Sequence, residues 1–484
     1  MTPQPASSES TNLDRRPDAT PGISGLRLWL FRLMALALAP CLLLALEGML
    51  RLSGYGYATS FLQPVAERDG WWTTNPQFSW RFFPRHLARS PVPFELSEEA
   101  EDQRRIFIIG GSAARGTPDS AYNFGRMLGV MLEHSYPEIE LEIFNAAMTA
   151  INSHVARVIV DDLEPRRGDL FIIYMGNNEV VGPFGAGTIF GQKRVLHRAL
   201  PSLPAIRASI ALNATRSGQL LASLIGDPDR ATSSEWRGME MFVEQVVDPA
   251  DPRLAQVRSH FRSNLASIIQ TLQRAGADIL LMTVATNLRD QAPFASLLPS
   301  EVTEDDARRW HELYETGRDA AASGSHRAAV DALAQAAEIE DRHAELRFHL
   351  GQAHLALGAP ERAKPHLIAA RDLDALRFRA DTEINQAIRG VAEDTGVPLL
   401  DVAQRFRDGT DEIPELPGYR LFHEHVHFNF AGNYALASAV HQHLAPRLDS
   451  APPANPRPQL TQQQVAERLA FTRFDELELE RDIL

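Results

Sequence analysis

The stretch LFHEHVHFNFAGNY, residues 421–434, brings together side chains that can do chemistry. Glu424 lies three residues before His427, and such a carboxylate can orient an imidazole that acts as the base of a serine hydrolase. The same letters contain His423-Glu424-x-x-His427, the zinc-binding pattern of metalloproteases. The two patterns predict different enzymes, a serine esterase or a zinc metalloprotease.

The zinc pattern requires both histidines on one face of a helix, one turn apart. Residues 428–432 are instead typical of a turn, with Asn429 capping a helix that begins after it. That helix contains no acidic residue as a third ligand, although His441 and His443 keep a metal site open. We therefore treat the metalloprotease as a remote alternative, beside a purely structural histidine cluster, and expect no metal or organic cofactor.

A candidate nucleophile, Ser112, follows an apolar run in RRIFIIGGSAARG, residues 104–116. A short apolar run bounded by glycines predicts a buried parallel strand that ends in a turn. Ligands of open α/β sheets bind at the carboxyl ends of the strands, where a helix N-terminus favours a developing anion. The alternative is that Ser112 only caps a helix.

The elements around Ser112 repeat the same arrangement. Residues 140–153 predict a strand followed by a loop of small residues, and residues 168–180 predict a strand that ends at Asn177 and Asn178. An asparagine amide or a loop N–H can stabilise an oxyanion, although asparagines at a strand end are usually turn formers.

Two further strands and an amphipathic helix complete the pattern. The strands are predicted over 277–284 and 397–402, and the helix over 254–274. Alternation of strands and helices predicts an α/β fold, with a parallel sheet between two helical layers.

Four short blocks carry a resemblance to a known family. FIIGGSAARG, NAAMTAINS, YMGNNE and EHVHFN, in this order, resemble the SGNH or GDSL-type esterase and lipase superfamily, over about residues 104–300 and 375–447. The resemblance implies a three-layer α/β/α, flavodoxin-like hydrolase. It implies these roles: Ser112 as nucleophile, His427 as general base, Glu424 as the carboxylate that orients it, and Ser112, Ala150 and Asn178 as the oxyanion hole.

The chain departs from the family pattern at three positions. Gly111 and Glu424 stand where the family has aspartate, and Ala150 stands where it has glycine. A backbone N–H donor survives the change from glycine to alanine if the loop dihedrals permit it, and glutamate can orient a histidine as aspartate does.

A different pattern interrupts the hydrolase. At an offset of 34 residues, Gly317 aligns with Gly351 and Leu333 with Leu367. This period resembles that of tetratricopeptide repeats and predicts an all-α insert over 306–374 that binds a protein partner. Two repeats are too few to stand alone, so the catalytic domain or a flanking helix should complete their core. The alternative is an alanine-rich hairpin without a binding role.

The N-terminal region predicts a membrane anchor. Leu28 to Leu46 is apolar except for Arg32, and no small-x-small cleavage site follows, which favours a signal anchor over a signal peptide. Its uninterrupted part, Leu33 to Leu46, is preceded by Arg15, Arg16, Arg27 and Arg32 and closely followed only by Arg51, so the N-terminus is expected in the cytoplasm.

The predicted organisation has seven parts. They are a disordered cytoplasmic tail (1–25), a transmembrane signal anchor (26–52), a linker or N-terminal extension (53–103), the first part of the hydrolase domain (104–305), the helical insert (306–374), the last part of the hydrolase domain (375–447), and a Pro-rich linker with a C-terminal amphipathic helix (448–484).

Composition excludes some classes of function. A net charge of −14 argues against a nucleic-acid partner, and the single cysteine, Cys41, excludes an intrachain disulfide framework. The sequence predicts a single-pass membrane protein whose extracytoplasmic domain, periplasmic or at the cell surface, hydrolyses acyl or acetyl esters of a small molecule, lipid or glycan. The alternatives are an O-acyltransferase on a cell-envelope glycan and a catalytically weak repeat-bearing scaffold.

Overall fold

A five-stranded parallel sheet forms the centre of the protein. The computed structural model describes residues 25–98, 104–190, 200–225, 238–448 and 457–483. The strands are β4 (Arg104–Gly110), β5 (Leu141–Asn145), β6 (Leu170–Tyr174), β7 (Asp278–Met282) and β8 (Leu399–Leu400). They lie in the order β5-β4-β6-β7-β8, and every neighbouring pair is parallel. The predicted α/β class with a parallel sheet is confirmed, and this strand order is the flavodoxin-like one.

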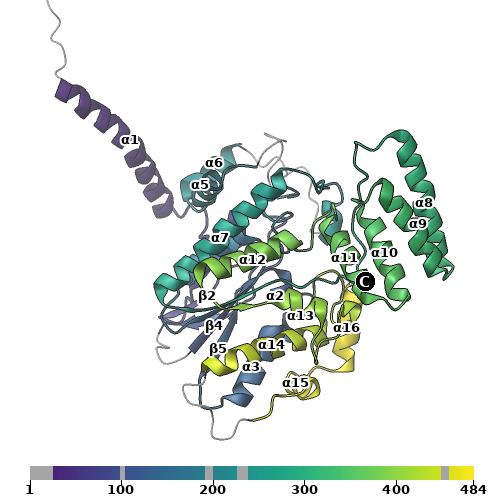
Figure 1. The fold of residues 1–484 in the computed structure, drawn as a ribbon. Helices are drawn as coiled ribbons and strands as arrows, with labels where there is room; N and C mark the ends of the chain where they lie inside the picture. The colour runs from purple at the N-terminus through teal and green to yellow at the C-terminus, as the bar shows by residue number, and fades with distance from the viewer. Residues whose placement is uncertain (1–24, 99–103, 191–199, 226–237, 449–456, 484) are drawn as a thin grey trace, which may run out of the picture.

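Helices cover both faces of the sheet (Figure 1). One layer contains α3 (Phe124–Ser135) and α14 (Phe430–Leu448), and the other contains α4 (Ser153–Asp162), α7 (Arg253–Ala275) and α12 (Thr382–Thr395). The central strands are apolar because both of their faces are buried. Phe107 of β4, for example, stacks between Phe144 and Phe171 of the neighbouring strands.

The carboxyl ends of three strands carry the segments that matter for chemistry. β4 leads into the short helix α2 (Ser112–Arg115), β5 leads through a loop to α4, and β6 leads into the loop that contains Asn178. Gly110 allows the end of β4 to approach β6 closely, because a Cβ there would lie 2.2 Å from the carbonyl oxygen of Tyr174.

Four helices form the insert between β7 and α12. They are α8 (Glu304–Ala322), α9 (His326–Ile339), α10 (Ala344–Ala356) and α11 (Pro360–Asp372), arranged as two hairpins beside the catalytic body (Figure 1). A Cβ on Gly317 would lie 2.5 Å from Leu333, and a Cβ on Gly351 would lie 2.5 Å from Leu367. The same close approach thus recurs after 34 residues. The tetratricopeptide assignment and its protein partner stay predictions from the sequence.

The second hairpin packs on loops of the catalytic domain. Leu367 of α11 belongs to a buried cluster with Leu288 and Leu416, which lie in two of these loops. Lys364 Nζ lies 2.6 Å from Glu415 Oε1 in the same contact. The catalytic domain therefore completes the core of α10 and α11.

The region from 53 to 98 forms a small sheet that the sequence did not predict. Strands β1 (Leu62–Pro64), β2 (Trp71–Thr74) and β3 (Glu95–Ser97) pair in antiparallel order. Their polar-aromatic composition lacks the long alternation by which strands are recognised. The C-terminal part forms two helices, α15 (Gln462–Arg468) and α16 (Arg473–Ile483), where one was predicted, because the chain turns at Ala470 with a positive φ.

The remaining helical elements are short. They are η1 (Phe78–Arg81), η2 (Ser120–Tyr122), α5 (Leu203–Asn213), α6 (Arg216–Ile225), η4 (Gly238–Phe242), α13 (Val402–Asp408) and η5 (Gly418–Arg420).

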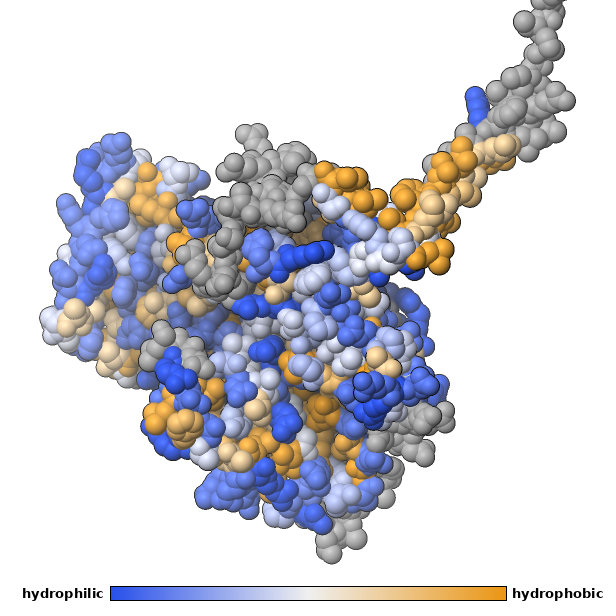
Figure 2. Space-filling view, turned by 180° about the vertical axis from the view of Figure 1, so that it is seen from behind, coloured by the Kyte–Doolittle hydropathy of each residue, from blue (hydrophilic) through white to orange (hydrophobic). Residues whose placement is uncertain are grey.

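Helix α1 (Gly25–Leu52) projects away from the body, and Figure 2 shows that apolar side chains gather along it. It is fixed to the body through Glu47, which accepts hydrogen bonds from the backbone N–H groups of Arg216 and Ser217 at the start of α6. Among the described residues, no helix is long and apolar enough to cross a membrane. Residues 1–24, which belong to the predicted disordered tail, and 449–456, which belong to the predicted linker, lie outside the described residues.

Candidate active site

Ser112 and His427 lie in direct contact at the carboxyl edge of the sheet. Ser112 is the first residue of α2, directly after β4, and its Oγ lies 2.7 Å from His427 Nε2. Gly111 before it is extended, and Gly116 after α2 adopts a left-handed conformation that ends the helix within four residues. The tight turn presents Ser112 at the helix N-terminus, as the sequence predicted.

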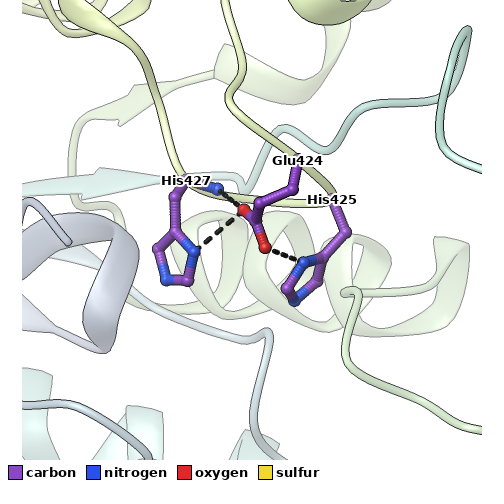
Figure 3. Close-up of side chains that lie close together, drawn as sticks. All are labelled: Glu424, His425 and His427. Atoms are coloured by element: carbon purple, nitrogen blue, oxygen red, sulfur yellow. Dashed lines mark hydrogen bonds and ion pairs between the residues drawn. The ribbon is translucent and has the colours of Figure 1, made fainter. Parts of the chain in front are cut away.

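Glu424 holds the other ring nitrogen of His427 (Figure 3). Its Oε1 lies 2.8 Å from His427 Nδ1 and accepts the backbone N–H groups of His427 at 2.7 Å and Val426 at 3.1 Å. Burial raises the pKa of Glu424, but the nearby His427 and His425 outweigh that effect and hold the pKa well below its usual range. The carboxyl group is therefore ionised, which suits an oriented histidine.

His425 is a second histidine on the same carboxylate, and the sequence interpretation missed it. Its Nδ1 lies against Glu424 Oε2, on the side away from His427 (Figure 3). Its ring is buried against Phe294 and Phe378, and burial lowers the pKa of His425. The apolar neighbours lie more than 45 residues away in the sequence, so the local pattern did not reveal them.

The helical geometry that the remote zinc-protease alternative requires is absent from the described loop. His423 and His427 flank a turn closed by an antiparallel bridge between Phe422 and Phe428, in which the N–H of His423 donates to the carbonyl of His427 at 2.8 Å. The histidines therefore do not share a helical face. Helix α14 begins after them, and Asn429 caps it as predicted by accepting the N–H of Gly432 at 2.9 Å.

A different set of side chains could hold a metal ion. Glu424, His425 and His427 offer ligand atoms that lie within 4.8 Å of one another. Imidazole and carboxylate are suitable ligands for zinc, but each carboxylate oxygen of Glu424 already faces a histidine nitrogen. Bound metal would have to displace the contacts that orient His427.

The other two predicted oxyanion residues, Ala150 and Asn178, lie in the loops after β5 and β6. Ala150 has a φ of +63°, so the loop does hold it in the left-handed conformation that glycine would adopt more easily. Asn178 Nδ2 donates to the carbonyl of Ile151 at 3.1 Å, which ties the loops after β5 and β6 together. A Cβ on Gly111 would lie 3.1 Å from Asn178 Nδ2. The lack of a side chain at 111 therefore leaves room for the Asn178 amide beside Ser112.

Asn177 has a structural role. Its Oδ1 accepts the N–H of Ala380 at 3.0 Å, in the segment that connects the insert to α12. Asn178, by contrast, donates its side-chain hydrogen bond to the loop that contains Ala150.

A buried carboxyl group, Glu179, lies directly after Asn178 and was not singled out from the sequence. It accepts the N–H of Ser153 at 2.9 Å and the Oγ–H of Ser153 at 2.8 Å. Burial raises the pKa of Glu179 to about 7, although the hydrogen bonds from Ser153 lower it. The only sequence signal was a charged residue between an asparagine pair and two valines.

Comparisons with known proteins find similarity in solved structures only. No family model matches the chain, and no curated protein matches it. The chain is similar to a lipase/acylhydrolase from Enterococcus faecalis, with 12% identity, a TM-score of 0.29, and coverage of 74% of this chain and 100% of that chain. The chain is also similar to an acetylxylan esterase from Geobacillus stearothermophilus, with 12% identity, a TM-score of 0.32, and coverage of 70% of this chain and 93% of that chain.

A Bacillus subtilis protein gives 13% identity and a TM-score of 0.33, with 74% of this chain and 60% of that chain covered. These similarities are too distant to carry an argument about function.

Proposed function

We propose that the chain is a serine esterase of the SGNH type, which hydrolyses carboxylic esters through a Ser-His-Glu triad and an acyl-enzyme. The observation that supports this function is the continuous contact from Ser112 Oγ to His427 Nε2, and from His427 Nδ1 to Glu424 Oε1, at 2.7 and 2.8 Å. A nucleophile in contact with a base that is itself oriented by a carboxylate is the arrangement that activates serine.

In the first half-reaction, Ser112 Oγ attacks the ester carbonyl carbon while His427 Nε2 takes its proton. The ionised carboxylate of Glu424 stabilises the imidazolium that forms. His427 then gives the proton to the departing alcohol, and Ser112 carries the acyl group. In the second half-reaction, water takes the place of the alcohol and releases the acid.

The oxyanion of the tetrahedral intermediates needs donors that are already in position. The N–H of Ser112 lies at the N-terminus of α2, and the N–H of Ala150 belongs to the neighbouring loop. Asn178 Nδ2 has two hydrogens and donates one to Ile151, which leaves the other for the oxyanion. These three donors complete the proposed site.

The proposal is tested with a fluorophosphonate probe and with p-nitrophenyl acetate, using the full-length chain. Ser112→Ala should abolish labelling and lower kcat/KM by about four orders of magnitude or more. Ser120→Ala, which changes a nearby serine without a side-chain role in the proposed site, should leave both readouts unchanged.

Two outcomes contradict the esterase. In the first, a chelator abolishes hydrolysis and Ser112→Ala keeps full activity. This result would favour a metal site at Glu424, His425 and His427. Absence of labelling in well-folded wild-type protein would favour the scaffold alternative.

The membrane anchor and the extracytoplasmic location are also part of this proposal. They rest on the sequence of residues 26–52 and on the exposed apolar side chains of α1, such as Leu33, Met34 and Leu44. The full-length chain should resist alkaline extraction from membranes, and a chain that begins at residue 53 should be released. Equal release of both chains would contradict the anchor.

A further inference from the structure

Two consecutive residues, Asn178 and Glu179, hold the loop that follows β5. Asn178 Nδ2 binds the carbonyl of Ile151 at 3.1 Å, and Glu179 binds both the N–H and the Oγ–H of Ser153, at 2.9 and 2.8 Å. On the other side of the same loop, Asn152 Nδ2 donates to the carbonyl of Pro183 at 2.7 Å. Every residue from 151 to 153 is therefore bound to the segment after β6.

Glu179 makes this contact as a buried carboxyl group. It is 3% exposed, and within the described part of the chain its hydrogen bonds come from Ser153 alone. Ser153 is the first residue of α4, so the carboxylate lies at a helix N-terminus, where negative charge is favoured. Asn264 Nδ2 donates to Ser153 Oγ at 3.2 Å, so the oxygen of that hydroxyl group also has a partner.

The loop held in this way begins with the strained residue Ala150. A non-glycine residue at a φ of +63° persists only where the surrounding contacts determine its conformation. On the C-terminal side of Ala150 these contacts run from Ile151 to Ser153, and on its N-terminal side the N–H of Met148 donates to the carbonyl of Gly110 at 3.1 Å. The bonds from Asn178 and Glu179 therefore contribute one of the two anchors that set the orientation of the Ala150 N–H.

We propose that Glu179 is a positioning residue of the oxyanion hole, which fixes the Ala150 N–H relative to the Asn178 amide. This inference rests on the esterase function proposed above. Glu179 acts through Ser153 and the loop, and it does not touch the substrate. Because oxyanion donors act on the tetrahedral species, its loss should affect the transition state more than substrate binding.

The experiment uses the full-length chain, p-nitrophenyl acetate as substrate and phenylboronic acid as a tetrahedral oxyanion mimic. Glu179→Ala should lower kcat about 10- to 100-fold with KM changed by less than about threefold, because loop displacements near 1 Å can have effects of this size. The inhibition constant of the boronic acid should rise by the same factor as kcat/KM falls. Glu179→Gln should restore most of the rate, because its amide can bind both groups of Ser153.

A matched control separates positioning from stability. Asp169→Asn changes another buried carboxylate, which pairs with Arg105 before the start of β6, at the opposite edge of the sheet. It should lower the melting temperature and leave kcat and boronic acid binding unchanged. If Glu179→Ala does not fold, Ser153→Ala removes one of the two bonds and should shift kcat and the inhibition constant together by a smaller factor.

The possible results are distinct. Three results overturn the positioning role while the esterase function stands. They are a wild-type kcat in folded Glu179→Ala, a rise in KM alone in that variant, and an equal loss of kcat in Asp169→Asn. A wild-type chain that neither hydrolyses the ester nor binds the boronic acid overturns the esterase function and this inference with it.

Discussion

Ala150 combines a proposed functional N–H with an unfavourable backbone conformation. A left-handed alanine costs about 1 kcal/mol relative to glycine, since its Cβ crowds the following carbonyl. We predict that Ala150→Gly raises the free energy of unfolding by about 0.5–1 kcal/mol and keeps ester hydrolysis within about threefold of wild type. Denaturant unfolding and p-nitrophenyl acetate hydrolysis measure the two effects. A less stable variant would show that the methyl group makes packing contacts that outweigh the strain.

Glu179 should make stability depend on pH in a predictable direction. Burial raises its pKa from 4.5 in the unfolded chain to about 7 in the folded protein, so between these values the folded state binds more protons than the unfolded state. Stability should therefore fall as the pH rises from about 5 to 8. One pKa unit corresponds to about 1.4 kcal/mol. Above pH 7, the free energy of unfolding of the wild type should therefore have fallen by roughly 3 kcal/mol relative to that of Glu179→Gln.

The measurement is the difference in unfolding free energy between wild type and Glu179→Gln at several pH values. A difference that stays constant from pH 5 to 8 would show that the carboxyl group has an ordinary pKa in the folded protein.

At the residue scale, contiguous motifs were predictable and long-range partners were not. Ser112 and Asn178 follow predicted strands, and Glu424 forms a local motif with His427. Their positions could therefore be predicted from residues nearby in the sequence. Glu179 and His425 depend on partners that only the folded chain brings near. Burial of a charge between apolar residues is visible only once the neighbours are known.

The two helical hairpins of the insert offer a matched comparison at the scale of elements. A Cβ added to Gly317 or Gly351 would lie 2.5 Å from a leucine side chain, so an alanine at either position should destabilise its hairpin by about 1–3 kcal/mol through overcrowding. Leu367 packs with Leu288 and Leu416 of the catalytic loops, whereas Leu333 belongs to a cluster formed mainly within the insert. We therefore predict that Gly351→Ala lowers kcat/KM severalfold while Gly317→Ala leaves it unchanged.

Steady-state hydrolysis and thermal unfolding of both variants check this prediction. Equal activity in the two variants would show that the packing of α11 is not transmitted to the catalytic loops.

Elements with a strong apolar pattern were predicted well. The five predicted strands correspond to β4 to β8, and the helix expected at 254–274 is α7. The antiparallel strands β1 to β3 were missed because they are short and lie in a segment with scattered tryptophans and phenylalanines. Local patterns reveal elements that are buried on a regular face and fail for elements held by tertiary packing.

At the scale of the whole molecule, the exit of the insert connects to the catalytic loop. Asp374 binds Arg379, which donates to the carbonyl of Asn287, and the N–H of Asn287 donates to the carbonyl of His425. Arg379, in the segment after the insert, is therefore linked to the neighbour of Glu424 through a single residue, Asn287. We predict that replacing residues 304–372 by a short linker lowers kcat at least about tenfold in a protein that remains folded.

Removal of the first hairpin alone, residues 304–339, is the matched control and should preserve the rate. Hydrolysis of p-nitrophenyl acetate by both shortened chains checks the prediction. Wild-type kcat after removal of all four helices would make the insert a separate docking module.

The two residues in the central contact of the site, Ser112 and His427, are 315 positions apart in the chain. Ribosomes add about 5–20 residues per second, so the base is synthesised roughly a quarter of a minute to a minute after its nucleophile. Their contact also requires α14, which follows His427 directly, to pack on α3. During synthesis the growing polypeptide therefore carries an unactivated serine, which should not hydrolyse esters in the compartment of translation until His427 and α14 have been synthesised.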